Sequence, residues 1–278
     1  MIQFFNNVKT AFLLGALFGL ILIAGWLLGS TTGLVIAFVF GGLGNVVMFF
    51  YSDKIAVKAM GGQEVDESSA PDLMQIVRRL SQQADIPVPR VYICPQEAPN
   101  AFATGRSPNH SAVAVTRGAL KLLEPRELEG VIGHELAHIK NRDTLTSTIA
   151  AVIAAGLSSL GYLFIFIPIW GDEDSNPLAL LAFIILAPVA AALIQAAISR
   201  SREFVADAEA AEIAGTPEGL VAALQKLEAA SKRIPMEHEN PGQNHMFIVK
   251  PLNAGAAFSK LFSTHPPTEA RIAKLRKQ

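Results

Sequence analysis

Residues 133–143 read GHELAHIKNRD, which places two histidines four positions apart with a glutamate directly after the first. An α-helix turns about 100° per residue, so His134 and His138 differ by about 40° and project from one face. Their imidazole rings can therefore bind one metal ion together. Glu135 lies about 100° round the helix from His134, where it can reach a water molecule on that metal without being a ligand. The stretch predicts a metal site with Glu135 as general base.

The residues before this stretch favour a helix with one buried side. Glu124-Pro125 predicts its start, because proline at the first helical position loses no hydrogen bond. Leu128, Val131 and Ile132 recur at helical spacing and supply the buried side. An ordinary polar turn of a helix stays open as the alternative until further ligands are found.

The composition favours a membrane protein. Of the 278 residues, 51% are hydrophobic, and the mean hydropathy is +0.36. The formal net charge is −1 and no long basic run occurs, which argues against nucleic acid as a partner. The only cysteine is Cys94, so no intramolecular disulfide can form.

Four apolar stretches without charged residues predict two helical hairpins in the lipid bilayer: 11–29, 33–51, 148–170 and 177–198. Each is long enough to cross roughly 30 Å of hydrocarbon as a helix. A cleaved signal peptide is the alternative for the first stretch, and a buried helical pair in a soluble core for the last two. The expected organisation is a hairpin at 1–51, a soluble part at 52–147, a second hairpin at 148–198 and a second soluble part at 199–278.

Basic residues predict the orientation of these hairpins. All those near the ends of the apolar stretches fall on one side of a four-span arrangement: Lys9, Lys54, Lys58, Lys140, Arg142, Arg200 and Arg202. Since positive residues are enriched on the cytoplasmic side, both termini and both soluble parts are expected in the cytoplasm.

The first soluble part predicts a mixture of helix and short strands. Ala70-Pro71-Asp72 opens an amphipathic pattern typical of a helix, and strand-like runs follow at 90–93, 101–104 and 112–116. The two soluble parts must meet to build one α+β domain.

The third metal ligand is expected where the second hairpin returns the chain to the same membrane face. Glu203 and Asp207 are spaced four residues apart there and share a helix face. Glu203 can complete the three-ligand set of a catalytic zinc, and Asp207 can accept a hydrogen bond from the outer nitrogen of a ligand histidine. The alternatives are a solvated acidic face and Cys94 as a ligand, although a buried strand position suits that cysteine better.

Four motifs in this order resemble the HtpX family of bacterial membrane zinc proteases, which is related to the CAAX prenyl endopeptidases: NAFATG (100–105), HELAH (134–138), EFVAD (203–207) and STHPP (263–267). The resemblance covers essentially the whole chain. It implies an α-helical membrane protein with an α+β zincin-like (gluzincin) cytoplasmic metalloprotease domain. It also implies a location in the bacterial cytoplasmic (inner) membrane and a role in quality control of misfolded or damaged membrane proteins.

By the same resemblance, His134, His138 and Glu203 are expected to bind one Zn²⁺ per chain, with Glu135 as the catalytic residue. His265 is expected near the site, as a hydrogen-bond donor to the substrate oxyanion; a helix-entry residue before two prolines is the alternative that the sequence alone favours. The stretch beginning Asn100, Ala101 and Phe102 is expected to present a strand edge to an extended substrate; an ordinary surface hairpin is the alternative. A nonproteolytic scaffold with a structural metal and a processing peptidase with one specific substrate stay open as other functions.

Overall fold

The computed structural model describes residues 56–147, 177–231 and 265–277 continuously, with short pieces of residues 8–54 and the residues 150 and 233. The chain divides into unit 1, residues 1–50 and 146–198, and unit 2, residues 51–145 and 199–278. The expected spans 11–29, 33–51 and 148–170 lie largely outside the described residues, and 177–198 belongs to helix α6 (Pro177–Ala214). In the described part of the chain, no helix has the length and apolar composition that crossing a bilayer requires.

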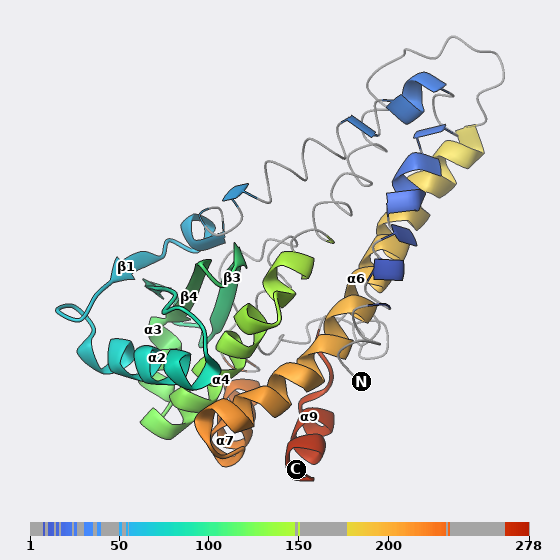
Figure 1. Ribbon diagram of the computed structural model, residues 1–278. Helices are drawn as coiled ribbons and strands as arrows, with labels where there is room; N and C mark the ends of the chain where they lie inside the picture. Colours follow the sequence, from blue (N-terminus) through green and yellow to red (C-terminus); the bar gives the residue numbers. More distant parts are fainter. Residues whose placement is uncertain are drawn as a thin grey trace. The chain divides into compact units, whose positions relative to one another are not determined.

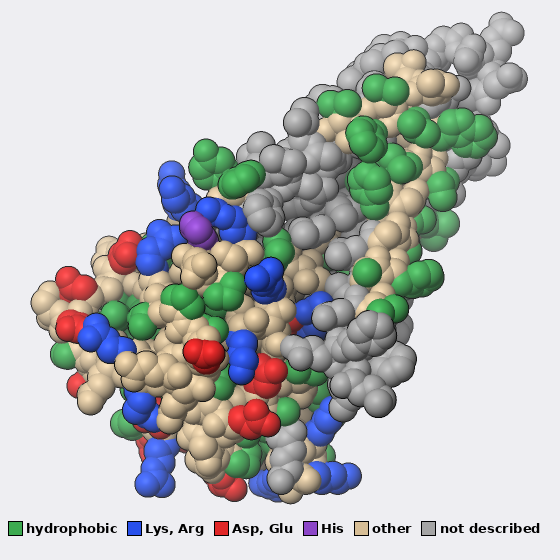
Figure 2. Space-filling model, in the orientation of Figure 1, with side chains coloured by type: hydrophobic (Ala, Val, Ile, Leu, Met, Phe, Trp, Pro, Cys, Tyr) green, Lys and Arg blue, Asp and Glu red, His purple; other side chains and the backbone are tan. Residues whose placement is uncertain are grey.

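Where it is described, unit 1 exposes large hydrophobic side chains. Phe12 is 73% exposed, Leu186 62% and Trp26 57%, and Figure 2 shows such side chains over the described parts of this unit. On the face of unit 2 that Figure 2 draws, acidic and basic side chains are interspersed instead. The described surface of unit 1 is therefore more apolar than the face of unit 2 that Figure 2 draws.

Unit 2 contains a four-stranded mixed sheet (Figure 1). Its strands are β1 (Gln63–Val65), β2 (Arg90–Cys94), β3 (Ala101–Ser107) and β4 (His110–Thr116), in the spatial order β1-β2-β4-β3. Strands β2 and β4 are parallel, and the other two pairs are antiparallel. The three strands predicted from the sequence are confirmed, and β1 is an addition. Within the described sheet β3 pairs only with β4, so its other side is an edge.

The helices of unit 2 come from both soluble parts of the chain. They are α2 (Pro71–Ala84), α3 (Arg117–Leu122), α4 (Pro125–Lys140), the C-terminal part of α6, α7 (Glu218–Ser231) and α9 (Thr268–Leu275). Helix α4 starts as predicted, with Pro125 in the first turn and a capping box between Glu124 and Glu127. It contacts β3 and β4 as well as α2 and α7, so the helix that carries the HELAH motif lies at the centre of unit 2.

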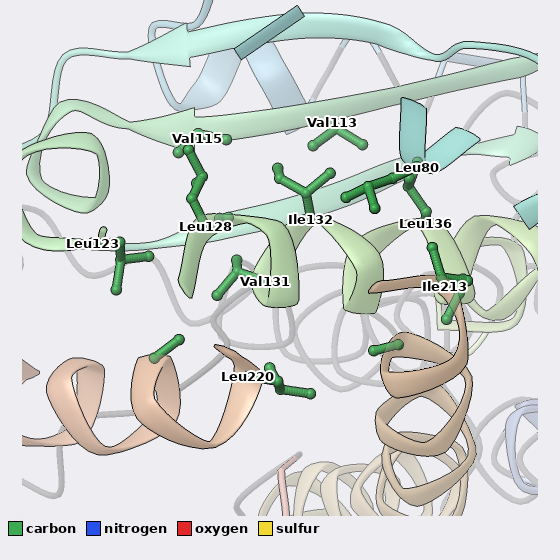
Figure 3. Packing of buried hydrophobic residues seen from close by; sticks show 14 of the residues in the cluster. Leu80, Val113, Val115, Leu123, Leu128, Val131, Ile132, Leu136, Ile213 and Leu220 are labelled. Atoms are coloured by element: carbon green, nitrogen blue, oxygen red, sulfur yellow. The ribbon is translucent and has the colours of Figure 1, made fainter. Parts of the chain in front are cut away.

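The core forms because α4 is apolar towards both of its neighbouring layers. Figure 3 shows Leu128 and Ile132 directed at Val113 and Val115 of β4, while Val131 lies towards Leu220 of α7. The opposite face of the sheet is covered by a second cluster that includes Val57, Met60 and Phe102, with Cys94 buried among them. Because residues on both faces of the sheet are buried, the sheet is a rigid support for α4.

Two glycines allow α4 and α7 to approach closely. A Cβ on Gly130 would lie 2.4 Å from the backbone nitrogen of Leu220, and one on Gly219 would lie 2.3 Å from the carbonyl oxygen of Arg126. Both distances are shorter than van der Waals contact, and the atoms met are backbone, which cannot rotate away.

Gly130→Ala is therefore expected to destabilise the protein by roughly 1–3 kcal/mol, the usual cost of overpacking, although alanine favours helix formation. Thermal unfolding of the purified protein measures the effect. Gly133→Ala is the milder comparison on the same helix, because its Cβ would lie 3.3 Å from the nearest atom, Ala210 O, which needs to shift by only a few tenths of an ångström. Equal unfolding temperatures for both variants would contradict the close helix crossing.

Candidate metal centre

The three expected metal ligands converge in unit 2. Helix α4 carries His134 and His138, and α6 carries Glu203; one ligand atom from each lies within 4.8 Å of the other two. The two histidine Nε2 atoms are 3.1 Å apart. The Glu203 carboxylate oxygens lie 3.6 Å from His134 Nε2 and 3.4 Å from His138 Nε2. Glu203 is 65 residues from His138 in the sequence, yet the three side chains form one cluster. Two nitrogen atoms and one oxygen atom are a ligand set that catalytic zinc sites use.

The outer nitrogen of each histidine faces a carboxylate. His134 Nδ1 lies 3.1 Å from Asp207 Oδ1, and His138 Nδ1 lies 2.9 Å from Asp143 Oδ2. Because a carboxylate only accepts hydrogen bonds, each Nδ1 carries a hydrogen, and each Nε2 directs a lone pair into the cluster. Two such lone pairs 3.1 Å apart, beside the Glu203 carboxylate, repel one another unless a proton or a cation lies between them. The residues therefore fit a divalent cation.

Charge in this cluster suits metal binding. Burial, together with the neighbouring His138, lowers the pKa of His134 to about 4, so that this ring is neutral at neutral pH. Burial acts to raise the pKa of Glu203, but His265, His138 and Arg271 outweigh it and hold the pKa well below its usual value. A neutral imidazole and an ionised carboxylate are the forms that coordinate zinc.

The pKa of His138 is shifted in the opposite direction from that of His134. Burial acts to lower the pKa of His138, but the hydrogen bonds with Asp143 and Glu203 outweigh it and raise the pKa well above its usual value. A proton on His138 is one way to relieve the repulsion between the two Nε2 lone pairs. A divalent cation held by His138 Nε2 would take the place of that proton.

Arg271 of α9 braces the acidic side of the cluster. Its Nη2 and Nε donate to the two oxygens of Asp207 at 2.6 and 2.9 Å, and its Nη1 lies 3.5 Å from Glu203 Oε2. Burial acts to raise the pKa of Asp207, but Arg271 and His134 outweigh it and lower the pKa to about 2. Arg271 is therefore buried against Asp207 and not in solvent.

Glu135 is buried in α4, next in sequence to the first ligand. Burial raises the pKa of Glu135 to about 7, and Glu203 adds to this effect against the opposing influence of His138. The backbone N–H of Ala103 in β3 donates a hydrogen bond to it. A carboxyl group with a pKa near neutrality can both accept and return a proton at the pH of a cell.

His265 also reaches the cluster. Its Nδ1 lies 2.7 Å from Glu203 Oε2, and its side chain is 10% exposed. The structure thus brings the STHPP motif to the site through a contact with a ligand carboxylate.

The predicted substrate-binding stretch lies in strand β3 and in the residue before it. The side chains of Asn100, Ala101 and Phe102 are all buried, so none of them is open to a substrate. Asn100 is bonded to Thr116 through both its N–H and its carbonyl. Since strand residues alternate in direction and the Ala103 N–H points to Glu135, the backbone of Ala101 and Ala103 faces the free edge of β3, while that of Phe102 faces β4.

Two residues at the site were missed by the sequence reasoning: Asp143, which contacts His138, and Arg202, which donates to Asp143. Asp143 lies within the quoted stretch 133–143, three residues after the end of α4. The signal that could have found it is the rule that a ligand histidine needs an acceptor for its outer nitrogen.

Comparisons with known proteins identify the family of this site. The model of the family described as Peptidase family M48 matches residues 67–278. The Protease HtpX homolog of Desulforapulum autotrophicum is 49% identical over 278 residues, which cover 98% of this chain and 89% of that protein. The Protease HtpX homolog of Thermococcus kodakarensis is 49% identical over 276 residues, which cover 97% and 95%.

A solved structure supports the fold. The crystal structure of S. mikatae Ste24p matches with a TM-score of 0.58 at 17% identity, over 99% of this chain and 66% of that chain. At this identity the likeness shows an α+β zincin-like fold and nothing further. The resemblance to HtpX proteases predicted from the four motifs is confirmed, and the chain belongs to peptidase family M48, whose members are metalloproteases that in general depend on zinc.

Proposed function

We propose that the protein is a membrane-bound zinc endopeptidase that hydrolyses peptide bonds in misfolded or damaged membrane proteins, as part of quality control and stress response in a bacterial cytoplasmic membrane. The observation that carries the proposal is the convergence of His134, His138 and Glu203 beside the buried Glu135. A structural zinc site is normally closed by four protein ligands, whereas three ligands and a neighbouring carboxylate suit hydrolysis.

A zinc ion held by these three side chains would supply Lewis acidity, which acidifies water and polarises a peptide carbonyl. Glu135 accepts the proton of the attacking water and delivers it to the leaving amine as the C–N bond breaks. His265 is the expected hydrogen-bond donor to the carbonyl oxygen as charge develops on it; Nδ1 faces Glu203, so Nε2 is the atom assigned to this role.

The edge of β3 is the expected site for the substrate backbone. An extended peptide can pair there with the backbone of Ala103, which already contacts Glu135. Pairing through the backbone selects substrates by their extended conformation and not by particular side chains. Such a site favours unfolded segments of many proteins over folded ones.

Location in the membrane is supported by the sequence and by the surface of unit 1. The four apolar stretches lack charged residues, and described side chains of this unit, such as Phe12 and Leu186, are large, hydrophobic and exposed. Lipid is the environment in which such a surface is stable. The basic residues at the ends of the stretches support an orientation with unit 2 and both termini in the cytoplasm.

The substrate class can be tested with one membrane protein in two states. The zinc-loaded protein in detergent micelles is expected to cut the denatured form at several unrelated sites and to leave the folded form intact, because only an extended segment can pair with β3. Mass spectrometry of the products measures this, and added chelator should stop it. Cleavage at one consensus site in every client would contradict broad quality control and favour a processing peptidase.

A further inference from the structure

The turn after α4 carries a carboxylate back to the second ligand histidine. Helix α4 ends at Lys140, and Arg142 adopts a left-handed conformation with φ of 56°. This interrupts the helical path after α4, and Asp143 Oδ2 lies 2.9 Å from His138 Nδ1, with Asp143 4% exposed. A carboxylate buried to this extent is stable only when it is paired.

The partner of Asp143 comes from the helix that carries the third ligand. Arg202 directly precedes Glu203 in α6, and its Nη1 donates to Asp143 Oδ1. Two further contacts hold the same turn: Asn141 Nδ2 donates to Glu209 Oε2 of α6 at 2.7 Å, and Thr144 Oγ1 donates to Gly105 O of β3 at 2.9 Å. The turn is therefore held against both α6 and the sheet.

Each ligand histidine contacts a carboxylate that in turn contacts an arginine, and each of these two chains of contacts is a relay. Asp207 accepts from His134 and is braced by Arg271, while Asp143 accepts from His138 and is braced by Arg202. The first relay joins α4 to α9 through α6. The second joins the end of α4 to α6, one residue before Glu203.

We propose that Asp143 and Arg202 are a positioning pair that holds His138 in the tautomer and orientation needed for the metal and thereby slows release of the ion. This inference rests on the proposed zinc centre. Asp143 fixes the hydrogen on Nδ1, so that Nε2 points its lone pair at the cluster, and Arg202 keeps the carboxylate from rotating away. Because Arg202 neighbours Glu203, the same contact couples the placement of two of the three ligands.

Loss of such an outer partner typically costs 10–100-fold in metal affinity. In Asp143→Ala, zinc is expected to leave roughly 10–100-fold faster than in the wild type. Asp143→Asn should lie between the two, because its amide oxygen can still accept from His138. Arg202→Gln should also be faster than the wild type, since the carboxylate remains but is no longer braced.

Stopped-flow transfer of zinc from the full-length protein to an excess of a coloured chelator measures these rates. Lys226→Gln is the matched control, because it removes another ion pair that joins α4 to a neighbouring helix, with Glu127 at 2.8 Å, away from the ligands. Unfolding temperatures with and without zinc complete the comparison. The control should lower both temperatures alike, whereas the Asp143 variants should lose mainly the stabilisation that zinc adds.

Release of zinc from Asp143→Ala at the wild-type rate would overturn the inference. Should that variant not fold, wild-type release rates in both Asp143→Asn and Arg202→Gln would overturn it equally. Failure of the proposed function is distinguishable, because the wild-type protein would then bind no zinc or Glu203→Ala would retain it.

Discussion

Glu135→Gln is expected to reduce peptide hydrolysis by about 10²–10⁴-fold while one zinc per chain remains bound. Glutamine cannot take the proton from the attacking water or return it to the leaving amine. It is nearly the same size as glutamate, and its amide oxygen can still accept from the Ala103 N–H, so the buried position is preserved. Cleavage of a denatured protein or a quenched fluorescent peptide, with metal analysis of the same sample, measures both quantities.

Glu129→Gln is the control for this substitution, because Glu129 lies on the same helix and pairs at the surface with Arg79. Breaking that contact costs little, since surface ion pairs contribute about 0–1 kcal/mol. Full activity is expected in the control. Equal activity in Glu135→Gln and the wild type would remove Glu135 from the mechanism.

Glu203→Ala is expected to abolish both zinc binding and hydrolysis. It removes the only carboxylate ligand of the described cluster, so affinity should fall by more than the roughly 10–100-fold that loss of an outer partner costs. It also leaves the nearby Arg271 and His265 without this carboxylate in a buried place. Zinc content after dialysis measures the effect, and Glu203→Gln separates loss of charge from loss of volume.

Glu212→Gln provides the comparison on the same helix, because Glu212 is exposed and lies outside the cluster. It should retain one zinc per chain and full activity. Glu203→Ala that still purifies with one zinc per chain would show that another residue completes the ligand set. The proposed site would then be wrong at its third position.

Local patterns explain why much of the fold could be predicted. Helix α4 follows from Pro125 and its apolar spacing, and β4 follows from a run of apolar strand residues. Strand β1 was not predicted because its three residues, Gln63–Val65, contain one apolar side chain and no alternation. Strand β3 was predicted, but which of its residues face the free edge depends on its pairing with β4.

The contacts of the site likewise divide into those that can be predicted from the sequence and those that depend on the tertiary structure. A contact between residues four apart on a helix can be predicted from the sequence. Asp143 reaches His138 only because the left-handed Arg142 changes the direction of the backbone after α4 ends. The pairing of Arg202 with Asp143 spans 59 residues and depends on how α6 packs. Such contacts leave no periodic signal.

The sequence by itself determined the relation of His134, Glu135 and His138, because the helix repeat sets their directions whatever surrounds them. Only the tertiary structure decided that Arg271, 64 residues beyond Asp207, braces it, and that Ala103 rather than Asn100 faces Glu135. Those contacts follow from burial of the shared core of unit 2, which selects one packing of distant elements.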